Sequence, residues 1–455
     1  MFKNNIDDYV IDVDSLINSA MKTIEKNSIG VVFVTKDNKV VGSLTDGDIR
    51  RHILSGGSIY DTAGACCNFE FVWIESGYDN EKILKMFDNK IKHIPVLKKD
   101  KSLNYVASKD TLKVEIDKNI TIKSRAPARI TFSGGGSDVN YYFKNIGVGA
   151  VVNAAISKYS YVTLSRRTDE KIVVSSYDLK MSASIPSICH IENIPREFSL
   201  LKSVINLFCP KGGFELHTRS DIAIGSGLGG SSSMCVALIG AFNEMLHLNL
   251  TKYQIANFAY HAERNLLGIA GGWQDQYASV FGGVNYIEFK DVKNVVYPLR
   301  IEPFTELELQ CNIFLCSTGL LHDSNKIHIQ QEASIKASKE KQNLIKMNVT
   351  LCEKLKDSLL TNNLSNFASI LDRSWYLKKK FSSQITNRKL NKIYEQAKLF
   401  GASAGKLIGA GAGGYFMFYV APNKQNSFLL KMAHSGFECT PIVFDRDGLQ
   451  TWTES

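Results

Sequence analysis

The chain has 455 residues, of which 44% are hydrophobic and 22% charged, as in an ordinary soluble globular protein. This length predicts roughly two to four domains, with cores large enough to need neither disulfides nor metals. The net charge of +9 is scattered, so it indicates attraction of anionic substrates rather than binding to nucleic acid. The densest lysine runs, 336–341 and 378–380, are interpreted as solvated helix faces.

The nine cysteines are irregularly spaced and contain no Cys-x-x-Cys pair. This pattern predicts neither a zinc site nor a disulfide framework. The first residues, MFKNNIDDYVID, lack the basic and apolar segments of a signal peptide. No apolar run is long enough to span a membrane. The expected location is therefore cytoplasmic and reducing, with no membrane partner.

Residues 1–115 are predicted to form a separate unit. A helix, two strands and a second helix are expected at 15–26, 30–35, 40–44 and 46–55. A weaker copy, with a helix and two strands, is expected at 79–87, 93–97 and 103–107. A repeat of about 65 residues suggests two similar halves packed face to face.

The segment Gly42–Arg51, GSLTDGDIRR, resembles a CBS domain, and the repeat resembles a CBS-domain pair. In that family a Thr and an Asp in this arrangement hold the ribose of an adenine nucleotide. The resemblance therefore implies a regulatory nucleotide site at Thr45 and Asp48. In the second copy Ser108 is not followed by an acid three residues later. The alternative is a structural or dimerising module without a ligand. A homo-oligomer is expected, because CBS pairs often associate.

A charged linker is predicted at 116–123, and the chemistry begins at Ser124. Strands are expected at 151–164, 172–177 and 214–224, an apolar helix at 231–246, mostly helix over 334–400, and strand again over 407–420. The first motif is Arg125–Asp138, RAPARITFSGGGSD, in which a strand leads into glycines and an Asp. Glycines allow close approach to a ligand, and the Asp can accept hydrogen bonds from sugar hydroxyls. Capping of a helix over 139–143 is the structural alternative.

The second motif is Gly225–Ser233, GSGLGGSSS, between a strand and the apolar helix. Glycine N–H groups and the positive end of a helix bind phosphate well. The spacing Gly-x-Gly-x-x-Gly also matches the dinucleotide fingerprint. That reading fails, because the acid about 20 residues on, Glu244, lies inside a continuing helix rather than at a strand end. The motif predicts a phosphate-binding loop.

Two further motifs follow. His261–Arg264 and Gly271–Tyr277 contain two acids, Glu263 and Asp275, that can divide Mg²⁺ binding from work on the attacking hydroxyl. The last is a glycine cluster over 405–414 within a strand pattern. Because such glycines weaken a strand, they indicate close backbone approach to a ligand or to the first glycine loop.

Together these motifs resemble the GHMP kinase family, over about residues 124–455. Within it, the resemblance is strongest to D-glycero-D-manno-heptose 7-phosphate kinases and related bacterial sugar kinases. It is carried by RAPAR at 125–129, GGGSD at 134–138, ISKYSYV at 156–162 and GIAGGWQDQY at 268–277. Three positions depart from the family pattern: Gly230 for serine, Ala412 for glycine, and His322 for arginine.

The resemblance implies roles for individual residues. Asp275 is the catalytic base or orients the acceptor hydroxyl, and Arg129 stabilises developing charge or positions Asp275. Ser231 and Glu263 hold Mg²⁺. The ATP phosphates are bound by Gly225, Gly227, Leu228, Gly229, Gly230, Ser231 and Ser232. The sugar is bound by Asp138, Gly135, Gly136, Ser137, Gly411 and Gly413, with Gly414 supporting the pocket. Candidate cations for a remote phosphate are Lys158, Arg166 and His322.

The implied fold is α+β, a two-domain GHMP kinase preceded by a CBS pair. Residues 124–325 form a lobe like domain 2 of ribosomal protein S5, and 326–455 form a ferredoxin-like lobe. The implied function is ATP- and Mg²⁺-dependent phosphorylation of a sugar hydroxyl, namely the anomeric hydroxyl of D-glycero-D-manno-heptose 7-phosphate, for nucleotide-activated heptose and surface polysaccharide. The alternatives are a kinase for fucose or a hexose, and a non-catalytic nucleotide sensor.

Overall fold

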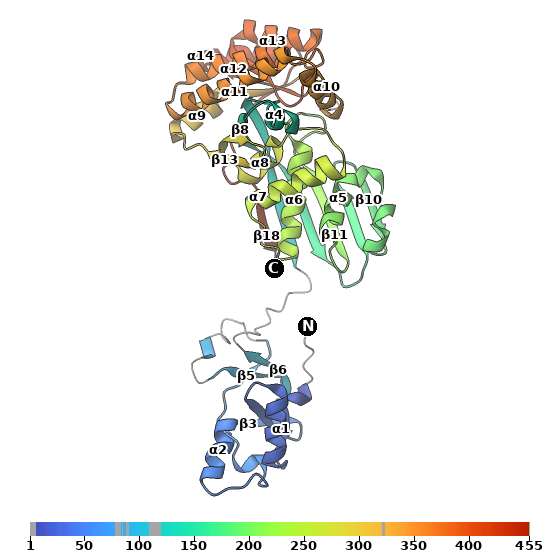
Figure 1. Ribbon diagram of the computed structural model, residues 1–455, viewed down its shortest axis with the longest axis vertical. Coiled ribbons are helices and arrows are strands. Elements are labelled where there is room, and N and C mark those ends of the chain that lie inside the picture. Colours follow the sequence, from blue (N-terminus) through green and yellow to red (C-terminus); the bar gives the residue numbers. More distant parts are fainter. Residues whose placement is uncertain are drawn as a thin grey trace. The chain divides into compact units, whose positions relative to one another are not determined.

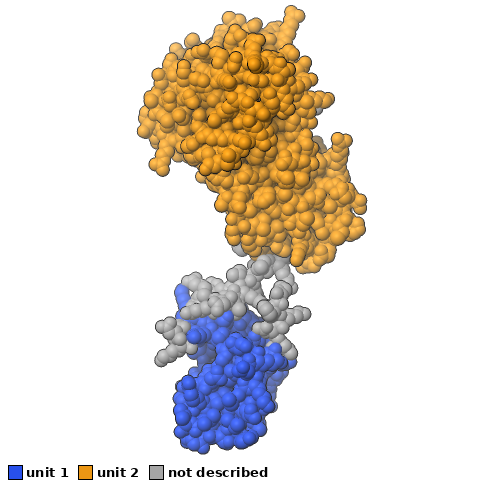
Figure 2. All heavy atoms as spheres, in the orientation of Figure 1, with its two compact units in different colours: residues 1–116 blue, residues 117–455 orange. Residues whose placement is uncertain are grey.

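The computed structural model describes residues 6–77, 83, 85–87, 91–108, 120–320 and 324–454. The chain divides into two compact units, Met1–Ile116 and Asp117–Ser455 (Figure 2). No helix within the described ranges combines the length and the apolar character needed to cross a bilayer.

The first unit contains the predicted repeat. Its first half consists of η1 (Ile6–Asp8), β1 (Val10–Asp12), α1 (Ile17–Asn27), β2 (Val31–Lys36), β3 (Lys39–Thr45), α2 (Asp46–Leu54) and η2 (Ala63–Ala65). The second half contains β4 (Ile74–Glu75), β5 (His93–Leu97) and β6 (Leu103–Ser108).

Both halves of this unit have the same sheet topology, with a parallel pair followed by an antiparallel hairpin. Phe33 of the first sheet and Leu97 of the second belong to one buried cluster, so the halves pack together as predicted. Most of the helix predicted over 79–87 lies outside the described residues.

The second unit begins before its predicted start. β7 (Thr121–Ser133) includes residues 121–123, which were assigned to the linker. Ile122 is buried, and its register neighbours are Leu164 and Thr453 on the two flanking strands. These pairings are long-range, so the lack of a local period over 109–123 did not indicate them. Residues 109–119 lie outside the described ranges.

Two long antiparallel strands, β7 and β8 (Gly149–Arg166), form the centre of an eight-stranded sheet. The remaining strands are β9 (Ile172–Ser176), β10 (Met181–Ile185), β11 (Phe214–Ser220), β12 (Val284–Phe289), β13 (Asn294–Pro298) and β18 (Gln450–Glu454). α5 (Ser199–Phe208), α6 (Gly230–Met245), α7 (Lys252–Tyr260) and α8 (Gln274–Phe281) share its buried core (Figure 1). Short segments complete it: α4 (Asn140–Asn145), η3 (Ile188–Asn193), η4 (Arg196–Phe198) and the π-helix η5 (His261–Leu266).

The second sheet has four antiparallel strands in the order β15-β16-β14-β17. These are β14 (Ile313–Ser317), β15 (Ala402–Leu407), β16 (Tyr415–Val420) and β17 (Cys439–Pro441). Its helices are α9 (Pro303–Asn312), α10 (Ser324–Lys336), α11 (Lys339–Leu360), α12 (Leu364–Lys379), α13 (Arg388–Phe400) and α14 (Pro422–His434). The β-α-β-β-α-β order is that of a ferredoxin-like lobe.

The lobes exchange strands across the boundary that was predicted at residue 325. β14 precedes that boundary but lies in the middle of the four-stranded sheet. β18, at the end of the chain, pairs with β7 in the eight-stranded sheet. The predicted boundary was therefore wrong for both strands, because sheet membership follows pairing partners rather than position along the chain.

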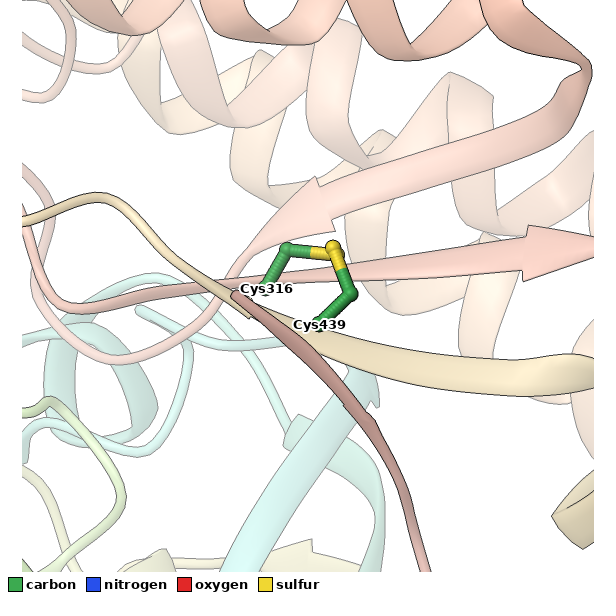
Figure 3. The surroundings of a disulfide bond; sticks show 2 residues. All are labelled: Cys316 and Cys439. Carbon is green, nitrogen blue, oxygen red and sulfur yellow. A yellow bond between two sulfur atoms is a disulfide. The ribbon is translucent and has the colours of Figure 1, made fainter. Parts of the chain in front are cut away.

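A disulfide joins Cys316 on β14 to Cys439 on β17 (Figure 3). The two residues are directly opposite each other in the antiparallel register, which brings their side chains together. They are 123 positions apart in the sequence. The expectation of no disulfides was therefore wrong, since this register is not visible in the cysteine spacing.

Candidate active site

The predicted phosphate loop leads into the N-terminus of α6. Gly225, Gly227 and Gly229 all have positive φ angles, which glycine adopts without strain. α6 begins at Gly230, and its first turn contains Ser231 and Ser232. The free N–H groups at this end of a 16-residue helix suit an anion. Leu228 differs from its neighbours, because its side chain is buried in the core.

Gly230, the departure from the family serine, has a local explanation. A Cβ atom at this position would lie 3.0 Å from the Cγ2 atom of Ile222. A serine here would therefore require Ile222 to move. Ser231 and Ser232 keep their hydroxyl groups, so the change does not remove the polar face of the loop.

Of the late glycines, Gly405 lies in β15, as the strand pattern predicted. The other four, at 409, 411, 413 and 414, lie in the loop between β15 and β16, and this loop packs against the phosphate loop. A Cβ atom on Gly409 would lie 2.6 Å from the Cα atom of Gly227, and one on Gly414 would lie 2.2 Å from the carbonyl oxygen of Ser226. The predicted approach to the first glycine loop is confirmed for these positions. Gly411 and Gly413 instead face backbone atoms of Ile385 and Leu320.

Arg129 and Asp275 form a bidentate ion pair. The Nε and Nη2 atoms of Arg129 donate to the two carboxylate oxygens of Asp275, each at 2.8 Å. Nη1 donates to the carbonyl oxygen of Gly227 at 2.5 Å, so the same guanidinium also holds the phosphate loop. Burial raises the pKa of Asp275 most strongly, but the charge and hydrogen bonds of Arg129, together with the charge of Arg264, outweigh burial and hold the pKa below its ordinary value.

Glu263 is fully buried on the π-helix η5. It accepts hydrogen bonds from the Ser231 hydroxyl at 2.8 Å, the Ser232 hydroxyl at 2.7 Å and the Gln276 amide at 2.6 Å. These contacts tie the first turn of α6 to the acid and bring together Ser231 and Glu263, the two residues expected to hold Mg²⁺. π-Helical turns are frequent at functional sites.

The donor set at Ser231 and Glu263 fits Mg²⁺. The Oγ atom of Ser231 and the Oε1 atom of Glu263 are 2.8 Å apart. This distance is close to the separation of about 3 Å between neighbouring ligands of an octahedral Mg²⁺ with bonds of about 2.1 Å. Across the described ranges no three His, Cys, Asp or Glu side chains converge as metal ligands. Mg²⁺ is usually held by one or two carboxylates together with substrate phosphates, so a sparse protein set is the expected kind.

Asp138 is buried at the end of the glycine turn after β7. It accepts hydrogen bonds from the backbone N–H groups of Gly136 at 3.1 Å and Gln274 at 3.3 Å. A Cβ atom on Gly272 would lie 1.9 Å from a carboxylate oxygen of Asp138, so any larger residue there would displace this carboxylate. Burial and then the charge of Asp275 raise the pKa of Asp138.

These residues line two adjoining pockets. The larger, of about 310 Å³, contains the phosphate loop, Glu263 and Asp275. It is also lined by apolar residues, which were missed in the sequence because they come from separate elements: Leu179, Leu200, Leu201, Ile222, Ile224 and Met234. The smaller, of about 30 Å³, contains Gly135, Gly136 and Asp138. Arg129 and Asp275 line both.

Several basic residues of the site were not predicted. Lys378 and Lys406 line the smaller pocket, and His328 lines both. Lys378 is only 6% exposed, so its interpretation as part of a solvated face was wrong. α12 turns this residue inward, while Lys380 remains exposed. Arg264 lines the larger pocket, and its buried Nε atom has no hydrogen-bond partner among the described residues.

Other predicted residues lie away from the pockets. The Ser137 hydroxyl is fully buried against the backbone of Gly134 and Ala150. Arg166 donates to the carbonyl oxygen of Met245, at the C-terminal end of α6 and thus about 24 Å from the phosphate loop. Lys158 lines neither pocket. His322 lies outside the described residues. Arg166, one of the candidates for a remote phosphate, therefore lies away from both pockets.

In the first unit, Thr45 and Asp48 form a capping box at the start of α2. The Thr45 hydroxyl donates to the Asp48 carboxylate at 2.6 Å, and Asp48 also pairs with Arg51. A nucleotide ribose bound to Thr45 and Asp48 would have to replace these hydrogen bonds with its own.

Comparison with known proteins agrees with this site. The model of the GHMP kinase N-terminal domain matches residues 199–283, and that of the CBS domain matches residues 5–55. A D-glycero-alpha-D-manno-heptose 7-phosphate kinase from Campylobacter jejuni is 37% identical over 340 residues, which cover 73% of this chain and 99% of the relative. The chain belongs to the GHMP kinase family.

Two solved structures support this membership. A D-glycero-D-manno-heptose 1-phosphate kinase from Bacteriodes thetaiotaomicron is 31% identical, with a TM-score of 0.62 over 73% of this chain and 99% of the other. A sugar kinase from Campylobacter jejuni, described as putative, is 35% identical, with a TM-score of 0.61 over 73% and 98%. The chain is thus a GHMP kinase fold with a CBS domain at its N-terminus.

Proposed function

We propose that this protein transfers the γ-phosphoryl group of ATP to the anomeric hydroxyl of D-glycero-D-manno-heptose 7-phosphate. The observation that carries the proposal is the convergence of the phosphate loop, the Ser231–Glu263 pair and the Arg129–Asp275 pair on one pocket. The similarity to a heptose 7-phosphate kinase over most of the chain supports the acceptor.

ATP binds with its phosphates on the α6 N-terminus and its adenine on the apolar side of the larger pocket. Ser231 and Glu263 hold Mg²⁺, which neutralises phosphate charge when it is bound. The unpartnered Nε atom of Arg264 supplies a further donor for a phosphate oxygen. Asp138 accepts hydrogen bonds from sugar hydroxyls.

Asp275 orients the acceptor hydroxyl. Its lowered pKa makes it a weak base, which suits a loose transition state in which little proton transfer precedes phosphoryl transfer. Arg129 fixes the carboxylate and links its position to the phosphate loop through Gly227. One guanidinium group thereby aligns the phosphoryl donor, ATP, with the acceptor hydroxyl.

The test is ADP release by the purified full-length protein with a panel of acceptors. The panel contains heptose 7-phosphate, heptose 1-phosphate, unphosphorylated heptose, fucose and galactose. Heptose 7-phosphate is expected to have the highest kcat/KM, and ³¹P NMR is expected to find the new phosphate on the anomeric carbon. A higher kcat/KM for fucose or galactose would mean that the acceptor is that sugar and not heptose 7-phosphate. Binding of ATP without turnover of any sugar would favour a nucleotide sensor.

For the first unit, we propose that an adenine nucleotide binds beside Thr45 and Asp48 and regulates the kinase. The CBS match supports this role. Titration of AMP into the full-length protein, with Asp48→Asn as the comparison, tests it. Equal heats for the two proteins would show that the nucleotide binds elsewhere.

A further inference from the structure

Two ammonium groups stand in the smaller pocket beside Asp138. Lys378 comes from α12 and Lys406 from β15, and they are only 6% and 2% exposed. Burying a cation is costly unless an anion compensates it. The two groups therefore need an explanation that ordinary surface lysines do not.

Neither lysine has a carboxylate partner within ion-pair distance among the residues that the structure describes. Lys378 donates to the carbonyl oxygen of Gly409, and Lys406 donates to that of Thr131 at 2.8 Å. An ammonium group has three N–H donors. Each lysine thus keeps two donors beyond its backbone contact.

The charge of this pocket is unbalanced. Arg129 is matched by Asp275, which leaves Asp138 as the one carboxylate facing two lysines on the pocket wall. Burial and the charge of Lys378 lower the pKa of Lys406, and burial and the charge of Arg129 lower the pKa of Lys378 to about 8. A bound dianion would reverse these effects and use the free donors.

We propose that Lys378 and Lys406 bind the phosphate group that the acceptor sugar already carries. This inference rests on the proposed function, and it assigns the phosphate to different residues from those predicted from the sequence. The acceptor spans the junction of the two pockets, where Arg129, Asp275, His328 and Gly409 line both. Its reacting hydroxyl meets Asp275, and its phosphate meets the lysines.

The main test is Lys378→Met, which keeps an unbranched apolar stem, one atom shorter, and removes the ammonium group. Equilibrium binding of heptose 7-phosphate without ATP is expected to weaken roughly 10- to 100-fold, the value of a charged hydrogen bond. Binding of unphosphorylated heptose and the KM for ATP are expected to change little. Lys380→Met, which removes an exposed lysine two positions away, is the matched control and is expected to bind both sugars normally.

Thermal stability separates phosphate binding from a structural role. Replacing a buried, unpaired cation by an apolar side chain is expected to leave the Tm unchanged or to raise it. The proposal would be overturned if Lys378→Met lowered the Tm, or if it weakened the binding of heptose 7-phosphate and of unphosphorylated heptose equally. Lys378 would then be a structural residue.

The proposed function can fail separately. If the unmodified enzyme prefers an unphosphorylated sugar, both the acceptor and this inference are wrong. If it prefers the sugar phosphate but Lys378→Met keeps that preference, only the assignment of the lysines is wrong.

Discussion

Arg129 and Asp275 lie 146 positions apart in the chain and meet in a bidentate pair in which both N–O distances are 2.8 Å. The pair joins β7 to the first turn of α8, and through Gly227 it reaches the phosphate loop. One side chain, that of Arg129, therefore contacts both Asp275 and the phosphate loop.

Asp275→Asn is expected to lower kcat by about 10²–10⁴-fold, because the amide cannot accept from the acceptor hydroxyl as a carboxylate does. The affinity for ATP is expected to stay within a few-fold of normal, since the phosphate loop is unchanged. Turnover numbers and a fluorescent nucleotide titration measure the two effects. Near-normal turnover would exclude Asp275 from the reaction.

Arg129→Lys keeps the charge but cannot form the two parallel hydrogen bonds. We expect kcat to fall by about 10²-fold. The pKa of Asp275 should also rise towards or above its ordinary value, because burial then prevails over the weakened ion pair. The acid limb of the pH–kcat profile is expected to move to higher pH. An unmoved limb would mean that another group controls it.

The lowered pKa of Lys378, about 8, predicts a pH dependence of acceptor use. As the pH rises through this value the free enzyme loses the Lys378 charge, so kcat/KM for the sugar phosphate should fall. The other charged groups facing it are Arg129, Asp138, Asp275 and Lys406. Lys378→Met should remove this alkaline limb. The same limb in both proteins would assign it to another group.

Gly409→Ala tests the contact between the two glycine loops. Its Cβ atom would lie 2.6 Å from Gly227, so the phosphate loop must shift and the KM for ATP is expected to rise. Gly436→Ala is the control, because its φ of 82° is also left-handed but its Cβ would meet nothing within 4 Å. Both variants lose about 1 kcal/mol for the left-handed alanine. Equal kinetics would show that the loop contact is not needed.

Removing the disulfide by Cys316→Ala and Cys439→Ala is expected to lower the free energy of unfolding by roughly 2–4 kcal/mol. The bond closes a span of 123 residues, which restricts the unfolded chain. Cys311→Ser, at an exposed free cysteine, should have no effect. Chemical unfolding with and without a reductant measures the change. If the reductant left the free energy of unfolding of the unmodified protein unchanged, the disulfide would not have this stabilising role.

Much of the site could be read locally. Gly225–Ser233 predicted a phosphate loop, because glycines, a helix start and serines follow one another there. Asp138, Glu263 and Asp275 each lay in a short motif, and the structure brings all three to adjoining pockets. Most strands and helices were also located, because their hydrophobic periods are local properties.

The sequence by itself determined the type of chemistry, since the phosphate loop, the acids and the glycines are contiguous patterns with local physical causes. Only the tertiary structure decided which residues from distant parts of the chain come into contact. It turned Lys378 inward, set Gly409 against Gly227, and paired Cys316 with Cys439. It also placed β14 and β18 in sheets that their chain positions did not suggest. Such contacts depend on partners far away in the sequence, so no local window contains the information that selects them.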